Sequence, residues 1–136
     1  MARILVDTSA VYTLLDRSDR WHDAAKVALG RLRDRHAQPT LTNFIVAESH
    51  ALLLSRLGAE RARTWLLTNV WSVERVSPQD EARAKEIIGQ YSDKTFSFTD
   101  ATSFAVMERL GLRSAFAFDP HFAQYGFELV GPPVQT

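Results

Sequence analysis

The sequence predicts an α/β fold in which helices cover both faces of a parallel sheet. Short apolar runs of strand length alternate with stretches of helical periodicity along the whole chain. No internal repeat, low-complexity tract or Pro/Gly/Ser-rich linker divides the 136 residues. We therefore expect one domain that spans residues 1–136.

The segments expected to be strands are short apolar runs, or runs in which apolar and polar residues alternate. They are residues 4–6, 39–41, 71–76, 96–98, 115–118 and 127–130. The first, Ile4-Leu5-Val6, stops at Asp7-Thr8-Ser9, which is typical of a buried parallel strand followed by a helix cap.

The segments expected to be helices carry apolar residues at intervals of three and four. They are residues 11–15, a stretch from about 19 to 32, 43–58, 59–68, 78–91, 99–110 and a turn that starts at 120. Gly58 stands where a left-handed helix end is expected. Ser77, followed by Pro78 and Asp80, has the pattern of a capped helix start.

The composition excludes several classes of site. The chain has no cysteine, so disulfides, thiolate zinc sites and cysteine nucleophiles are excluded. No apolar run approaches the ~18 residues of a membrane span, and the first ten residues lack the layout of a signal peptide. We expect a cytoplasmic protein that does not associate with membranes.

Charge alone does not indicate a nucleic-acid partner, because sixteen basic and sixteen acidic residues cancel. Arginine nevertheless outnumbers lysine by 13 to 3, and arginine binds phosphates through a planar fork. Six arginines form two groups: Arg31, Arg33, Arg35, Arg56, Arg61 and Arg63. Either they lie on solvated helix surfaces or they contact phosphates.

Aspartates follow three of the expected strands. Asp7 comes after residues 4–6, Asp100 after 96–98 and Asp119 after 115–118. One such aspartate could simply cap a helix, which contributes about 0.5–2 kcal/mol. Since Ser, Thr, Asn and Gly would cap as well, three aspartates suggest that acidic groups gather at the carboxyl edge of the sheet, where ligands bind in such folds.

A fourth acidic residue, Glu48, lies in a stretch that is apolar on nearly all sides, residues 44–54. This pattern predicts a helix pressed into the core. A carboxylate there is costly unless it is paired or binds a metal ion. The alternative to a metal site is a buried ion pair with an arginine.

If these four carboxylates converge, they need cations. Two carboxylates about 4 Å apart repel by about 4 kcal/mol at an effective dielectric constant near 20. Ligands that are all oxygen favour Mg²⁺ or Mn²⁺ over zinc. Two such ions would balance four negative charges, and a pair about 3.5–4 Å apart is an arrangement that hydrolyses phosphodiesters.

Four segments of the chain resemble the PIN-domain ribonucleases, and among these the small VapC-type toxins of bacterial toxin–antitoxin pairs. They are ILVDTSAVYTLLD, LTNFIVAESHALL, KTFSFTDATSFAVMERLGL and AFAFDPHFAQYGFELV. The resemblance implies a three-layer α/β/α sandwich with a parallel sheet of about five strands. It also implies metal-dependent cleavage of RNA that leaves a 5′-phosphate and a 3′-hydroxyl.

The resemblance further implies an acidic pocket that binds Mg²⁺ or Mn²⁺. Its expected ligands are Asp7, Glu48, Asp100 and Asp119, with Thr8, Ser9 and Thr99 at the hydroxyl positions of the pattern. Asp93 also falls on a frequently acidic position, although a surface role is equally expected. Pro120 departs from the basic or polar residue that the family often has there, and His121 is expected on the surface more than against phosphate.

The expected partners are an RNA substrate and a cognate antitoxin, in a homodimer or a toxin–antitoxin hetero-oligomer. A housekeeping PIN-type RNA-processing nuclease and a non-catalytic RNA- or protein-binding module remain alternatives. A phosphotransfer receiver is disfavoured because Asp7 has no acidic neighbour and Lys94 precedes residues 96–98. An aspartyl-phosphate phosphatase is disfavoured because Ser9 stands where a second aspartate is needed.

Overall fold

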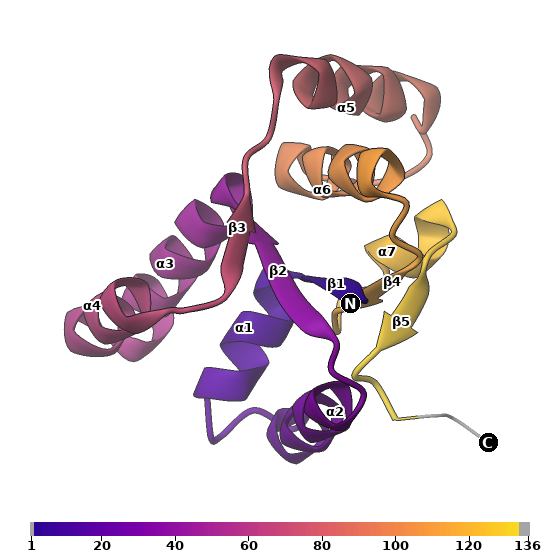
Figure 1. The fold of residues 1–136 in the computed structure, drawn as a ribbon. Coiled ribbons are helices and arrows are strands. Elements are labelled where there is room, and N and C mark those ends of the chain that lie inside the picture. The colour runs from indigo at the N-terminus through magenta and orange to yellow at the C-terminus, as the bar shows by residue number, and fades with distance from the viewer. Residues whose placement is uncertain (1, 134–136) are drawn as a thin grey trace.

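A five-stranded parallel sheet forms the centre of the protein, with the strand order β3-β2-β1-β4-β5 (Figure 1). The computed structural model describes residues 2–133. The strands are β1 (Arg3–Val6), β2 (Gln38–Thr42), β3 (Ser72–Glu74), β4 (Ser114–Phe116) and β5 (Glu128–Val130). The parallel sheet of five strands expected from the sequence is confirmed.

Seven helices in the described part of the chain complete the three layers. They are α1 (Thr8–Leu15), α2 (His22–Asp34), α3 (Asn43–Leu57), α4 (Ala59–Thr68), α5 (Pro78–Gln90), α6 (Phe98–Leu110) and α7 (His121–Tyr125). Figure 1 shows α1–α4 on one side of the sheet and α5–α7 on the other. None of these helices has the length and apolar character needed to cross a membrane.

The first strand occupies the middle of the sheet. Leu5 and Val6 of β1 are fully buried, as are Leu41 of β2 and Phe116 of β4 on either side. Strands buried on both faces are typical of parallel sheets covered by helices. Because β1 lies at the centre, the residue that follows it, Asp7, emerges at the middle of the carboxyl edge.

Residues 96–98, expected to be a strand, are not one. Phe96 and Ser97 form an irregular segment, and α6 begins at Phe98. Ser97 is the N-cap of α6: its Oγ accepts from the main-chain N–H of Asp100 at 3.0 Å, and the Asp100 carboxylate accepts from the N–H of Ser97. This capping box starts the helix where the alternation of Phe96, Ser97 and Phe98 had indicated a strand.

The expectation that α3 is enclosed by the core is wrong. Its buried residues are Ile45, Ser49 and Leu53, which lie on one face. Glu48 is exposed on another face, and Leu54 is 47% exposed. The helix packs against α1, α4, α6 and β2 but still leaves part of its surface to solvent, so apolar residues on several sides did not indicate burial on all sides.

The core beneath α6 is mainly aromatic. Phe104 of α6 is fully buried; its ring packs edge-on against Phe96 and Phe122, with centroids 5.0 Å away in each case. Tyr125 stacks on the same ring at 4.5 Å. Phe104 therefore joins α6, α7 and the segment before α6, the elements that position two of the expected site residues.

Replacing Phe104 with alanine should lower the free energy of unfolding by about 3–5 kcal/mol, because it leaves a cavity in a closely packed aromatic cluster. Urea denaturation measures the loss. Leu67→Ala is the control: Leu67 is 75% exposed, and its truncation should change stability by less than about 0.5 kcal/mol. Equal effects of the two substitutions would contradict this account of the core.

Candidate metal and active site

Asp7 lies at the carboxyl end of β1, where it serves as the N-cap of α1. Its main-chain N–H donates to the carbonyl of Phe116 in β4, and only 4% of the residue is exposed. Its Oδ2 accepts from the N–H of Ser9 at 3.2 Å and from the Ser9 hydroxyl at 2.7 Å. The side chain is thereby held at the centre of the carboxyl edge.

Ser9 connects this strand end to the segment that follows β4. While its hydroxyl donates to Asp7, its Oγ accepts from the N–H of Phe118 at 2.9 Å. Phe118 directly precedes Asp119. Ser9 therefore sets the position of Asp7 relative to the chain that carries Asp119, a role that the hydroxyl position of the sequence pattern did not specify.

Asp100 reaches the same edge from α6. It is the third residue of the helix, and its Oδ2 accepts from the N–H of Ser97 at 3.0 Å. The residue is 7% exposed. The sequence predicted Asp100 as a site residue at the end of a strand, but the first turn of a helix positions it.

Asp119 and His121 complete the group. Asp119 Oδ1 accepts from the main-chain N–H of His121 at 2.8 Å, and the His121 Nδ1 lies 3.1 Å from the same oxygen. That Nδ1 is also 2.8 Å from Oδ2 of Asp100. His121, expected mainly on the surface, thus lies between two of the predicted acids, and its side chain is 20% exposed.

The spacing Asp-Pro-His is the signal that could have revealed the contact between His121 and Asp119. An aspartate carboxylate commonly accepts from the N–H two residues ahead, which brings the side chain at that position close to the carboxylate. Asp119 and His121 have this relation, with Pro120 between them.

The pKa of Asp7 depends on the other two aspartates. Burial raises the pKa of Asp7 to about 7; the hydrogen bonds from Ser9 oppose the shift, while the charges of Asp100 and Asp119 increase it. Loss of solvation and nearby like charges both disfavour an ionised carboxyl. In the structure Asp100 and Asp119 meet at His121, and the charges of both act on Asp7; Glu48, the fourth acid expected at the site, is not among these charges.

Within residues 2–133, no arginine pairs with any of the four predicted acids. The alternative of a buried ion pair at Glu48 is therefore wrong for the part of the chain that the structure describes. A buried carboxylate does pair with arginine elsewhere: Asp80 Oδ2 lies 2.9 Å from Nη2 of Arg109. The converging aspartates are thus left without a compensating guanidinium.

Glu48 lies at the margin of the site. It lines a shallow depression with Thr99, Phe44, Asn43 and Ala47. Of its lining residues, Thr99 directly precedes Asp100 in the sequence, but no aspartate lines the depression. Glu48 is absent from the charges that shift the pKa of Asp7.

Thr8 faces α3 rather than the aspartates. It is buried, and its Oγ1 accepts from the hydroxyl of Ser49 at 3.3 Å. This contact joins the start of α1 to α3.

Asp93 forms an ion pair with Lys94 at 3.3 Å and is exposed, in agreement with a surface role.

The donor chemistry of the site fits a hard divalent cation. The Oδ1 atoms of Asp7 and Asp100 accept no hydrogen bond from the described residues, whereas their Oδ2 atoms are bonded. Free carboxylate oxygens are the ligands that Mg²⁺ and Mn²⁺ prefer. Within residues 2–133, however, no group of three or more His, Asp or Glu side chains is arranged so that it could hold a metal ion.

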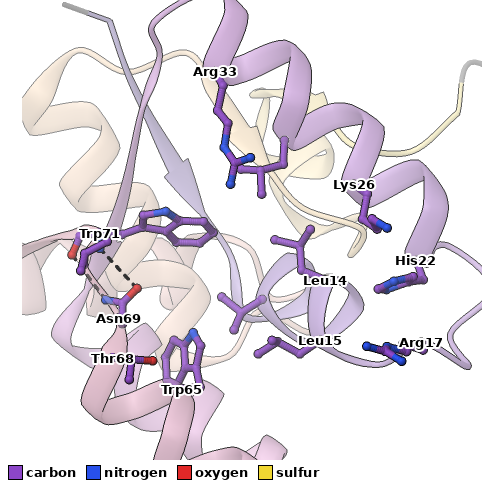
Figure 2. A pocket seen from close by; sticks show the side chains of 13 residues that line it. Leu14, Leu15, Arg17, His22, Lys26, Arg33, Trp65, Thr68, Asn69 and Trp71 are labelled. Carbon is purple, nitrogen blue, oxygen red and sulfur yellow. Dashed lines mark hydrogen bonds between the residues drawn. The ribbon is translucent and has the colours of Figure 1, made fainter.

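A second hollow lies away from the aspartates, and we call it the α1–α4 groove (Figure 2). Its apolar lining includes Leu14, Leu15, Trp65 and Trp71. The cationic residues along it are Arg17, Lys26 and Arg33. None of these three forms an ion pair with the described residues, so the groove combines an apolar floor with free positive charge.

The raised pKa of Asp7 predicts how stability depends on pH in the metal-free protein. The unfolded chain releases this proton near pH 3.8 and the folded chain near pH 7. The contribution of Asp7 to the free energy of unfolding is therefore greatest below about pH 4, and it should fall by at most about 4 kcal/mol as the pH rises to about 7. Urea denaturation in the presence of a chelator measures this loss.

Asp7→Asn is the control for that measurement, because asparagine can still accept from Ser9 but has no proton to lose. The difference in stability between wild type and Asp7→Asn should change between pH 4 and 7 and stay constant above. A difference that is flat across this range would contradict the burial and charge described for Asp7.

Comparison with known proteins agrees with this fold. The PIN domain family profile matches residues 4–128. The 23S rRNA-specific endonuclease VapC20 of Mycobacterium tuberculosis, in strains CDC 1551 / Oshkosh and H37Rv, is 37% identical over 133 residues, which cover 95% of this chain and 98% of the relative. The crystal structure of VapC20, described as a sarcin-ricin loop cleaving toxin, superposes with a TM-score of 0.84 at 34% identity and covers 95% of this chain and 99% of that one. The chain therefore belongs to the PIN-domain family, among its VapC-type endoribonucleases.

Proposed function

We propose that this protein is a toxin that cuts RNA with the help of Mg²⁺ or Mn²⁺ bound by Asp7, Asp100 and Asp119. The observation that supports this proposal most is that Asp100 and Asp119 meet at His121 beside the buried Asp7, with no arginine among the described residues paired to any of the three. Such a group is unfavourable for folding unless a cation is present, so its position at the carboxyl edge favours a functional role.

The residues have distinct tasks in this proposal. Asp7 and Asp100 would hold cation through their free Oδ1 atoms, since Ser9 and Ser97 already engage the Oδ2 atoms. Asp119 would bind directly or through water. Glu48 and Thr99, which line the adjoining depression, would contact a second ion or the water around it.

When bound, a pair of divalent cations supplies charge stabilisation and an acidified water, which is the chemistry of phosphodiester hydrolysis. The protein's own contribution is orientation: Ser9 and Ser97 hold the carboxylates on rigid strand and helix ends. The expected products carry a 5′-phosphate and a 3′-hydroxyl.

For the substrate, we propose the sarcin-ricin loop of 23S rRNA. The support is the likeness to VapC20, which extends over 95% of this chain. A housekeeping PIN nuclease that processes other RNA is the alternative. A short RNA hairpin with the loop sequence separates the two, because a housekeeping nuclease should show no preference for it over a scrambled hairpin.

Asp100→Asn should abolish cleavage of the hairpin while the protein remains folded, because it removes a ligand charge but keeps an acceptor for Ser97. Asp93→Asn is the matched control, since Asp93 is exposed and pairs with Lys94; it should cleave at the wild-type rate. A gel-based cleavage assay with excess Mg²⁺ or Mn²⁺ measures both. Wild-type cleavage by Asp100→Asn, or undiminished cleavage in a chelator, would contradict the metal mechanism.

We further propose that a cognate antitoxin binds the α1–α4 groove through an acidic segment with apolar side chains. Leu14, Trp65 and Trp71 offer apolar surface, and Lys26 and Arg33 are charges without partners among the described residues (Figure 2). Complementary charge speeds association and selects the partner. The groove therefore fits the chemistry of such a segment better than that of a neutral or basic one.

The double substitution Lys26→Glu/Arg33→Glu should weaken antitoxin binding by at least about 10-fold, because it reverses the charge beside the apolar floor. Calorimetry with the antitoxin encoded beside the toxin measures the affinity. Lys85→Glu/Arg113→Glu, an equal charge change at exposed positions outside the groove, should stay within about 3-fold of wild type. Equal losses in both double variants would show a general charge effect and exclude the groove as the docking site.

A further inference from the structure

His121 is the one histidine in the described chain that contacts the converging aspartates. It begins α7, two residues after Asp119, and its side chain is 20% exposed. None of the tasks proposed above involves it. Its surroundings nevertheless restrain both its position and its orientation.

The imidazole Nδ1 meets two carboxylates from different parts of the chain. It lies 2.8 Å from Oδ2 of Asp100 and 3.1 Å from Oδ1 of Asp119. Because ionised carboxylates only accept, a hydrogen on Nδ1 is the assignment that satisfies both contacts, whatever the state of Nε2. The ring therefore places an N–H between two groups that would otherwise repel each other.

The orientation of the ring is set by contacts outside the aspartates. It packs edge-on against Phe96 with centroids 5.6 Å apart, and Phe96 in turn packs edge-on against Phe104. At the other end of the ring, Nε2 lies 3.4 Å from the Thr95 hydroxyl. Since the segment 95–97 leads into α6, the same chain that orients the ring also starts the helix of Asp100.

Asp119 depends on this ring more than Asp100 does. The Asp100 side chain is also held by the N–H of Ser97, and it is 9% exposed. The Asp119 side chain is 35% exposed, and among the described residues its hydrogen-bonding partners all belong to His121. Without the ring, the main-chain N–H of residue 121 would remain to hold Asp119, and repulsion would turn the carboxylate toward solvent.

We propose that His121 is a positioning residue: its Nδ1–H holds the carboxylates of Asp100 and Asp119 together so that both can bind one divalent cation. This inference rests on the proposed metal-dependent function. It assigns no proton transfer to the imidazole. Groups that hold metal ligands in place commonly contribute 10- to 100-fold to metal affinity.

The test compares His121→Asn with His121→Gln and His121→Ala. An asparagine amide can place an N–H where Nδ1 lies, whereas the longer glutamine places it near Nε2, so the pair separates the position of the donor from its chemical type. Binding of Mn²⁺ alone, without RNA, is measured by isothermal titration calorimetry. Cleavage of the hairpin is measured in parallel as a function of Mn²⁺ concentration.

We expect Ala and Gln to weaken Mn²⁺ binding by about 10-fold or more, and Asn to stay within about 3-fold of wild type. At saturating Mn²⁺, the kcat of all three should return to within about 3-fold of wild type, because a positioning residue takes no part in the chemical step. Melting temperatures in a chelator verify folding. If the Ala variant does not fold, the Asn–Gln comparison still decides the matter.

Unchanged Mn²⁺ affinity in the Gln variant would overturn the proposal, as would equal losses in Asn and Gln. A kcat that stays about 100-fold low at saturating Mn²⁺ with unchanged affinity would instead make His121 a participant in the reaction, which also overturns it. If wild type binds no Mn²⁺, the metal-dependent function fails and the role of His121 fails with it. Normal binding by wild type with no effect of the substitutions contradicts the role of His121 alone.

Discussion

The burial of the Asp7 carboxylate is the constraint on which the site depends. A central parallel strand ends at this residue, so its side chain emerges where the sheet is least accessible to water. The hydrogen bonds from Ser9 recover part of the lost solvation, but the pKa is still raised to about 7. The nearby charges of Asp100 and Asp119 make ionisation of the Asp7 carboxyl still less favourable. A protein selected for stability alone would avoid this combination, so its presence is best explained by a ligand of positive charge.

Much of the fold could be predicted because its signals are local. The buried run of residues 4–6 and the cap at Ser77 each depend on side chains adjacent in sequence, and the structure confirms both. Residues 96–98 show the limit of such reasoning. Alternating Phe, Ser and Phe is compatible with a strand, but the reciprocal contacts between Ser97 and Asp100 make a helix start instead. Which pattern prevails depends on the packing of Phe96 against Phe104, which local sequence does not reveal.

Local sequence signals predicted only part of the site. Asp7, Asp100 and Asp119 were singled out because each follows a segment expected to be a strand, and the carboxyl ends of parallel strands meet at one edge. For Asp100 the expected strand does not form, and the start of α6 carries the residue instead. Glu48 was expected in a buried helix, yet it is exposed, since apolar residues around α3 do not all face neighbouring elements. The contact of His121 with Asp100 joins residues 21 positions apart and could not be deduced from spacing, although its proximity to Asp119 could.

In both Asp7 and Asp100, one carboxylate oxygen is hydrogen-bonded within the protein and the other is not. In each, Oδ2 binds donors of the protein, from Ser9 in one case and from Ser97 and His121 in the other, while Oδ1 has no partner among the described residues. A carboxylate bonded through one oxygen is fixed in direction without losing its charge, so it can bind a cation with little rearrangement. Capping a helix uses only one oxygen of each aspartate, so the second oxygen of Asp7 and of Asp100 is left to accept from a ligand. This combination of a fixed and a free oxygen is what the proposed binding of a cation by Asp7 and Asp100 requires.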